Sequence, residues 1–298
     1  MPYYKKYDPA VAARKKRNAE IFRETLSIIG KGFYTAPSGK TVTLPSLSPM
    51  LLGAECFHRE LPPSEGVPLP GGTTVMVEKG DCLEVAGRLV REGYNVALLN
   101  FASAGHPGGG VETGARAQEE TICRRSTLAR SIYTFSPSYA SKYGFEEHRG
   151  EGYPLKNLRH SVIYSPSVTV FREGIECTLM EEPFQVGVIT CAALNLGGKY
   201  DLRLTPDGHM PEDAVDITRC KVRAILRIGL KFGHDSLVLG AFGCGAFRNP
   251  PREMAEIFRD VMSEKEFEGK YRLITFAIIE DHNSLNSNYG AFREVLAK

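Results

Sequence analysis

The chain has 298 residues, of which 42% are hydrophobic, so it is long and apolar enough for one large domain or two modest ones with a packed core. Its 37 Lys and Arg nearly balance its 35 Asp and Glu. The resulting net charge of +2 excludes a generally basic protein that binds nucleic acid in bulk, so we expect no direct DNA binding. A polyanionic ligand would have to be met by a local group of charges.

Neither a membrane segment nor a metal site is predicted. The N-terminal residues lack the apolar core of a signal peptide, and no run of about 18 apolar residues occurs. We therefore expect an intracellular, cytoplasmic protein, or a nuclear one if the source is eukaryotic. The seven cysteines form an odd set without C-x-x-C spacing, which predicts reduced and mainly buried thiols, no zinc and no cofactor.

The first 70 residues are predicted to form an N-terminal helix and an irregular extension packed on the main domain. Residues 9–30 carry apolar positions at helical spacing, and Gly30 and Gly32 end the segment. Residues 31–72 are rich in Pro, Ser and Gly, which indicates a wrap or hairpin. The basic run from Arg14 to Arg17 fits a nuclear address or a polyphosphate contact, although a solvated helix face is the interpretation favoured.

From residue 71 to residue 298 the pattern is that of an α/β domain. Strands are expected at 73–77, 96–99, 162–171 with a break at Pro166, 185–192, 237–242 and 273–279. Helices are expected after the cap Asp81, over 118–133, before Gly233, after Pro250 and Pro251, and at the C-terminus. Residues 134–160 are predicted to be a long exposed loop, and residues 280–288 a polar segment. The alternation predicts a sheet between two helix layers, with residues 73–99 as a βαβ unit.

One stretch carries the main functional signal. The buried strand at 96–99 is followed by Gly105 and by three consecutive glycines, Gly108 to Gly110. Glycines without side chains let ligand oxygens approach backbone N–H groups, so we expect this loop to contact an anionic or sugar ligand. After a spacer of seven residues come Gln118, Glu119 and Glu120.

This ordered combination, with Asn100 ahead of it, resembles the signature of microbial-type poly(ADP-ribose) glycohydrolases. The resemblance extends to the stretches that begin at Tyr164, Val186 and Gly240, and so covers roughly residues 70 to 285. It implies a macrodomain-like three-layer α/β/α fold with a mixed central sheet. It also implies that ADP-ribose binds across the carboxyl ends of the strands.

The resemblance assigns roles to individual residues. Glu120 is implied as the catalytic acid and base, while Glu119 and an upstream polar residue, Ser103 or Asn100, orient it and the ribose. Phe247 would pack near the scissile ribose and Phe276 near adenine, although a core aromatic is the favoured interpretation of Phe276. The full set of candidate substrate contacts is Asn100, Ser103, Gly108, Gly109, Gly110, Gln118, Gly243, Cys244, Gly245, Ala246, Phe247 and Phe276.

The second glycine loop, Gly240 to Gly245, lies between a strand and a proline-started helix, a context in which backbone N–H groups hold phosphate. The alternative is a tight turn that needs glycine only for its dihedral angles.

Cys244 invites interpretation as a nucleophile, which we reject because the G-x-S-x-G pattern is not met and no histidine is close in sequence. His106 is more simply a loop residue, although its place beside the glycines allows substrate contact.

Adjacent residues on a helix point about 100° apart, so Glu119 and Glu120 are not expected to flank one bond, and one of them must do most of the chemistry.

The favoured function is hydrolysis of the ribose–ribose O-glycosidic bond of poly(ADP-ribose), with ADP-ribosylated proteins as partners and a monomeric chain. The alternatives are a mono-ADP-ribosyl-protein hydrolase and a non-catalytic ADP-ribose-binding module.

The state of Glu120 poses a further question. The first helical turn and Arg124, one turn later, both favour the ionised carboxylate, which cannot protonate a leaving group. We therefore expect that the substrate diphosphate, held by the two glycine loops, raises the carboxyl pKa.

Overall fold

The computed structural model describes residues 8–148, 153, 155, 159–197, 203–280 and 288–297. Its helices are α1 (Pro9–Lys31), α2 (Ser48–Gly53), α3 (Cys82–Arg91), α4 (Gln118–Arg125), α5 (Leu128–Ile132), α6 (Pro137–Tyr143), α7 (Glu212–Lys231), α8 (Pro251–Met262) and α9 (Asn288–Leu296), with short 3₁₀ turns η1 (Val111–Thr113) and η2 (Tyr133–Phe135). Its strands are β1 (Phe33–Thr35), β2 (Thr41–Thr43), β3 (Glu55–Phe57), β4 (Thr74–Lys79), β5 (Val96–Phe101), β6 (Val162–Glu173), β7 (Thr178–Cys191), β8 (Ser236–Leu239) and β9 (Leu273–Ile278).

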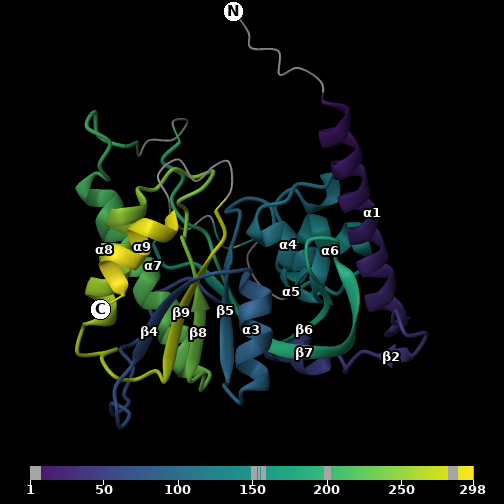
Figure 1. Cartoon of the computed structure of the whole chain (residues 1–298), viewed down its shortest axis with the longest axis horizontal. Coiled ribbons are helices and arrows are strands. Elements are labelled where there is room, and N and C mark those ends of the chain that lie inside the picture. Colours follow the sequence, from purple (N-terminus) through teal and green to yellow (C-terminus); the bar gives the residue numbers. More distant parts are fainter. Residues whose placement is uncertain are drawn as a thin grey trace, which may run out of the picture.

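The centre of the molecule is a mixed seven-stranded sheet in the order β3-β6-β7-β5-β8-β9-β4 (Figure 1). From β7 to β4 the neighbouring strands are parallel, whereas β6 and β3 are antiparallel at one edge. The predicted βαβ unit exists, but β8 and β9 lie between its two strands. The predicted mixed sheet is thus confirmed, and five parallel strands end on the same side of it.

Helices cover both faces of this sheet, as the alternating burial of β5 requires. Ala97 and Leu99 pack in a core with α7, α8 and α9, while Val96 and Leu98 pack in a second core with α1, α3, α4 and α5. Figure 1 shows these two helix groups on opposite sides of the strands. A strand buried on both faces reads as a continuous apolar run, which is what residues 96–99 are.

Several boundaries differ from prediction. The helix expected over 118–133 is interrupted, because Ser126 forms an isolated bridge with Val170 of β6 and the Thr127 N–H donates to the Thr169 carbonyl. The expected loop at 134–160 contains α6, and Ala140 is buried. Strand β6 continues past Pro166 through a bulge, with Ser167 at a φ of 50°.

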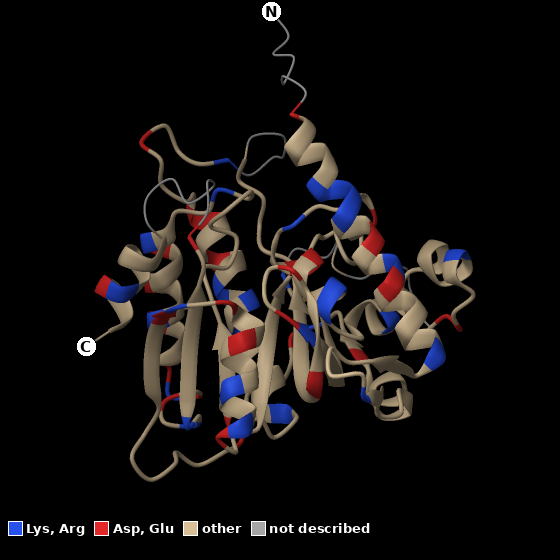
Figure 2. Cartoon of the chain, turned by 45° about the vertical axis from the view of Figure 1, so that its right-hand side comes forward, with Lys and Arg blue, Asp and Glu red and all other residues tan. Residues whose placement is uncertain are grey.

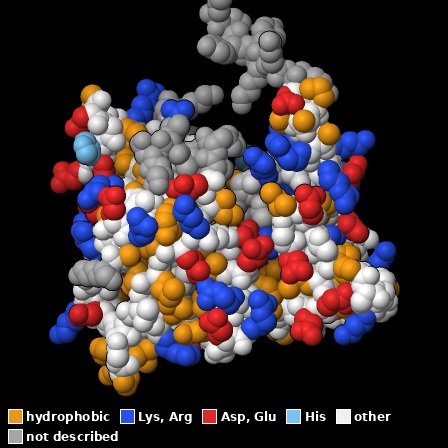
Figure 3. All heavy atoms as spheres, viewed as in Figure 1, with side chains coloured by type: hydrophobic (Ala, Val, Ile, Leu, Met, Phe, Trp, Pro, Cys, Tyr) orange, Lys and Arg blue, Asp and Glu red, His pale blue; other side chains and the backbone are white. Residues whose placement is uncertain are grey.

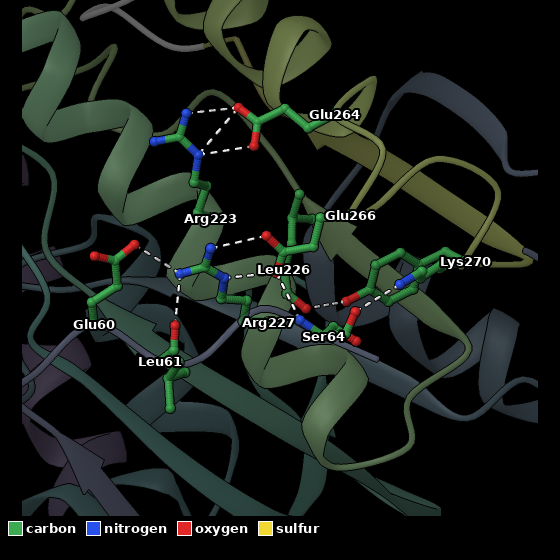
Figure 4. Close-up of polar contacts among 10 residues, drawn as sticks. Glu60, Leu61, Ser64, Arg223, Leu226, Arg227, Glu264, Glu266 and Lys270 are labelled. Carbon is green, nitrogen blue, oxygen red and sulfur yellow. Dashed lines mark hydrogen bonds and ion pairs between the residues drawn. The ribbon is translucent and has the colours of Figure 1, made fainter. Parts of the chain in front are cut away.

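The N-terminal extension is integral to the domain. Strand β3 precedes residue 70 and pairs with β6, so this extension contributes an edge strand to the central sheet. The following segment is pinned to α7 by Arg227, which donates to Glu60, to the Leu61 carbonyl and to Glu266 (Figure 4). The Arg227 side chain is only 8% exposed, so loss of this residue would leave the Glu266 carboxylate without its main partner.

All seven cysteines are free thiols and five are buried, as predicted. No helix in the described part of the chain is long and apolar enough to cross a membrane. The polar segment expected at 280–288 lies outside the described residues, apart from its two ends.

Candidate active site

A cavity of about 680 Å³ opens where the parallel strands end. Each of the five strands contributes its carboxyl end or the loop that follows it, which is the usual ligand position in an open α/β sheet. The wall includes residues after β4 (Gly80, Asp81, Cys82), after β5 (Phe101 at its end, Ser103, His106, Gly109, Gly110), after β7 (Ala193), after β8 (Ala241, Gly243, Gly245, Ala246, Phe247) and at the end of β9 (Ala277, Ile278, Ile279). Helix α4 closes one side with Gln118, Glu119, Glu120 and Thr121.

Both candidate catalytic glutamates lie in the first turn of α4, after the N-cap Ala117, and both are buried. Their carboxylates do not diverge as expected from the helix geometry. The long side chains bend towards the same glycine loop, and a Cβ placed on Gly109 would overlap Glu120 Oε1 and lie 3.1 Å from Glu119 Oε2. The two carboxyl groups therefore meet at one point of the cavity wall.

The backbone of that loop holds the carboxylates. The Gly108 N–H donates to Glu119 Oε1 at 3.0 Å, and the Gly110 N–H donates to Glu120 Oε1 at 2.8 Å. The Gly109 N–H donates to the His106 carbonyl at 2.9 Å. These three N–H groups are therefore used within the protein, while Gly109 and Gly110 still line the cavity, so contact of this loop with a ligand stays a prediction. Glycine is needed at position 109 because both carboxylates approach its backbone too closely for a side chain, whereas a Cβ on Gly108 would meet Tyr133 and one on Gly110 would meet Ala115.

Glu119 is held on both oxygens, since the Ser103 N–H donates to its Oε2 at 2.7 Å. Burial raises the pKa of Glu119 to about 8, and the charge of Glu120 adds to this effect, while the N–H groups of Ser103 and Gly108 oppose it. Burial thus favours the protonated form of the Glu119 carboxyl group before any substrate binds.

Glu120 is held on one oxygen only. Its Oε2 is buried and accepts no hydrogen bond from any residue that the structure describes. Arg124 forms no ion pair with Glu120 in the described chain, because its guanidinium donates to the Ala115 carbonyl and to Thr121 Oγ1. Glu120 thus has one anchored oxygen and one oxygen without a protein partner.

Two polar residues, Gln118 and Asn100, hold the glutamates and the neighbouring strand in place. Gln118 donates from Nε2 to the Leu99 carbonyl at 2.7 Å and accepts the Phe101 N–H at 2.7 Å, so its amide fastens α4 to β5. Asn100 is fully buried, donates to Thr190 Oγ1, and helps to lower the pKa of Glu119 through its side chain. Gln118 lines the cavity, whereas Asn100 lies behind the wall.

The second glycine loop forms the opposite wall. Gly243 has a φ of 75°, and the buried Asn249 amide donates to the carbonyls of Gly243 and Leu194. The N–H groups of Gly245, Ala246 and Phe247 donate to no residue in the described part of the chain. This loop, unlike the first, keeps backbone donors for a ligand.

Comparison with known proteins adds the family. The Microbial-type PARG, catalytic domain family matches residues 22–173, about half of the chain. This chain belongs to that family. The structure of poly(ADP-ribose) glycohydrolase from Thermomonospora curvata bound to the inhibitor ADP-HPD is 31% identical, covers 93% of this chain and 98% of its own, and has a TM-score of 0.74. The Deinococcus radiodurans enzyme in complex with ADP-ribose is 32% identical, with coverages of 85% and 97% and a TM-score of 0.64. No curated protein matches the chain.

Not every candidate residue of this microbial-type PARG domain reaches the cavity. Phe276 is fully buried and packs on Phe258 and Phe292, so the expected adenine contact is wrong and the core interpretation holds. Cys244 is also buried behind the loop, where burial raises the pKa of its thiol well above the usual range, which supports the rejection of a nucleophile.

Sequence reasoning missed other wall residues of this PARG domain. Phe101 lies beyond the strand predicted at 96–99, and Arg116 and Asn288 belong to no motif, yet all three line the cavity. Asp81 was predicted as a helix cap, and its Oδ1 accepts the N–H groups of Leu83 and Glu84. The position of Asp81 directly after β4 could have predicted that it lines the site, because ligands in a parallel sheet bind at the carboxyl ends of the strands.

Proposed function

We propose that this chain hydrolyses the ribose–ribose O-glycosidic bond of poly(ADP-ribose) and releases ADP-ribose, with Glu120 as general acid and base. The observation that carries the proposal is the state of Glu120: one carboxylate oxygen is anchored by the Gly110 N–H and the other has no described partner, in the wall of a large cavity. An anchored carboxyl group with one free oxygen can transfer a proton at a defined position.

The reaction balances with Glu120 alone. The protonated carboxyl gives its proton to the glycosidic oxygen, the bond from that oxygen to C1 of the ribose breaks, and positive charge develops on the sugar. The carboxylate so formed then takes a proton from a water molecule, whose oxygen bonds to C1. Glu119, which accepts two backbone N–H groups, holds the loop in place rather than attacking the sugar.

The rest of the cavity fits an ADP-ribose unit. The free N–H groups of Gly245, Ala246 and Phe247 suit the diphosphate, and the rings of Phe101 and Phe247 offer apolar walls. The relatives bound to ADP-ribose and to ADP-HPD support the same class of ligand.

One experiment separates the three candidate activities. Automodified polymer and a singly ADP-ribosylated protein are offered separately, and free ADP-ribose is followed from each. Release from polymer supports the proposal. Release from the singly modified protein alone would assign a mono-ADP-ribosyl hydrolase, and tight binding of ADP-ribose without release from either would assign a binding module.

We expect the reaction to be independent of added metal. Three of the four oxygens of Glu119 and Glu120 already accept backbone N–H groups, which leaves too few ligands for a hard cation that prefers six or more oxygens. The rate of polymer hydrolysis should be the same with and without EDTA. Loss of activity with chelator and its return with Mg²⁺ would contradict this prediction.

The pH profile should show the proton held by the glutamate pair. Because burial raises the pKa of Glu119 to about 8, the pair holds a proton below that pH and loses it above, so kcat/KM should fall on the alkaline side of about pH 8. A kcat/KM that stays constant well above pH 8 would contradict this assignment.

Bound diphosphate adds negative charge near the pair, so the alkaline fall of kcat should lie at a higher pH than that of kcat/KM. Identical profiles for the two parameters would exclude a contribution from substrate and leave burial as the source of the proton.

A further inference from the structure

A group of exposed positive charges lies beside the segment that leads to the catalytic wall of the cavity. Residues Arg14, Lys15, Lys16 and Arg17, the α1 basic turn, are all exposed. Figure 2 shows this turn as a blue band near the N-terminal end of α1, and Figure 3 shows Lys and Arg side chains over the same part of the helix. In a chain with a net charge of +2, four consecutive positive charges are a local feature.

The turn is fixed in place against the segment that leads to the glutamates. Lys15 contributes its carbonyl to a contact with Gly114 so close that a Cβ on Gly114 would overlap it. One turn further along, Asn18 Nδ2 donates to the Gly114 carbonyl at 3.1 Å. Gly114 is two residues before Arg116, which is exposed and lines the cavity. The α1 basic turn and Arg116 therefore adjoin across one close backbone contact.

Nearby acids do not neutralise these charges. Glu112, the acid of η1, is held by Lys142 at 2.6 Å and by the Tyr143 hydroxyl. Asp8 caps α1 by accepting the N–H groups of Ala10 and Val11. Glu20 is half-buried one turn beyond Lys16. Within the described part of the chain, no ion pair involves the α1 basic turn or Arg116.

The positive charges of the α1 basic turn also do not stabilise the helix itself. Arg14 and Arg17 are three residues apart on α1, and like charges at this spacing destabilise a helix. They lie beyond the first turn of α1 and far from its last turn, so the helix dipole gives them no stabilisation. An arrangement of like charges that has no ion-pair partner among the described residues and adjoins the site is best explained by a ligand.

We propose that the α1 basic turn and Arg116 bind the phosphates of the polymer unit next to the scissile bond. This inference rests on the proposed function, because Glu120 protonates the leaving oxygen and the leaving unit must therefore begin beside Glu120. The diphosphate of that unit is the nearest anion outside the cavity. A singly ADP-ribosylated protein has no such phosphate, so the surface selects polymer over the single modification.

The test compares two fourfold variants of the full chain. The first carries Arg14→Gln, Lys15→Gln, Lys16→Gln and Arg17→Gln. The control carries Lys31→Gln, Lys40→Gln, Arg91→Gln and Lys265→Gln, which removes the same charge at exposed positions that do not line the cavity. Each is made with Glu120→Gln to prevent turnover, and binding of labelled oligo(ADP-ribose), ADP-ribose monomer and a single-stranded DNA with the same number of phosphates is measured at several salt concentrations.

We expect the first variant alone to lose about tenfold in affinity for the oligomer at low salt, with a shallower dependence of log Kd on log salt by about one for each lost phosphate contact. ADP-ribose monomer should bind equally to both variants. Equal oligomer binding by the two variants would overturn the inference. So would DNA binding as tight as oligomer binding with the same loss, which would assign a nucleic-acid surface.

Failure of this inference is distinct from failure of the proposed function. If the unsubstituted chain leaves polymer intact, the proposed function fails, whatever the binding data show. If it cleaves polymer and the α1 basic turn has no effect beyond the control, only the present inference fails.

Discussion

Replacement of Glu120 by Gln should lower kcat for polymer hydrolysis by about 10²–10⁴ or more, as expected when a positioned proton donor and acceptor is removed. The amide keeps an oxygen that can accept the Gly110 N–H, so the loop and α4 should stay in place. Affinity for ADP-ribose should therefore survive, and titration of the variant with ADP-ribose separates loss of chemistry from loss of binding.

The matched control is Glu176→Gln, which removes one negative charge at an exposed position outside the cavity. It should hydrolyse polymer at the normal rate. Near-normal hydrolysis by the Glu120 variant would show that Glu120 is not the acid. Loss of ADP-ribose affinity together with activity would show that its role is structural.

Gly109→Ala should reduce kcat/KM by about 10²-fold while the protein remains folded. The new Cβ would overlap Glu120 Oε1 and lie 3.1 Å from Glu119 Oε2, so both carboxylates must move. Displacement of a catalytic group by about 1 Å can cost this much in rate. The positive φ of 56° at Gly109 adds strain of about 1–2 kcal/mol for any other residue, which thermal unfolding would register.

Gly105→Ala provides the control on the same loop. Gly105 has no neighbouring atom within 4 Å of an added Cβ and no positive φ, so alanine there should leave both activity and Tm unchanged. If the two alanine variants behaved alike, the close approach at Gly109 would not matter for catalysis.

Local sequence patterns were sufficient to predict most of the helices and strands. The apolar run at 96–99, the cap Asp81 and the spacing in α7 depend on neighbours in sequence, and each predicted element formed. The helical break at Ser126 could not be predicted, because it depends on pairing with Val170, which is distant in sequence. The same holds for β3, whose three residues become a strand only by pairing with β6.

The sequence by itself determined that Glu119 and Glu120 begin a helix after a triple-glycine loop, because the order of residue types records both features and the family to which they belong. Only the tertiary structure decided what the glycines do. Every residue except proline carries the same backbone N–H group, so a sequence does not indicate which acceptor each N–H meets. The acceptors depend on how the loop packs against α4. Folding directs the N–H groups of Gly108 and Gly110 to the carboxylates, leaves one oxygen of Glu120 without a partner among the described residues, and buries Glu119 so that its pKa rises to about 8.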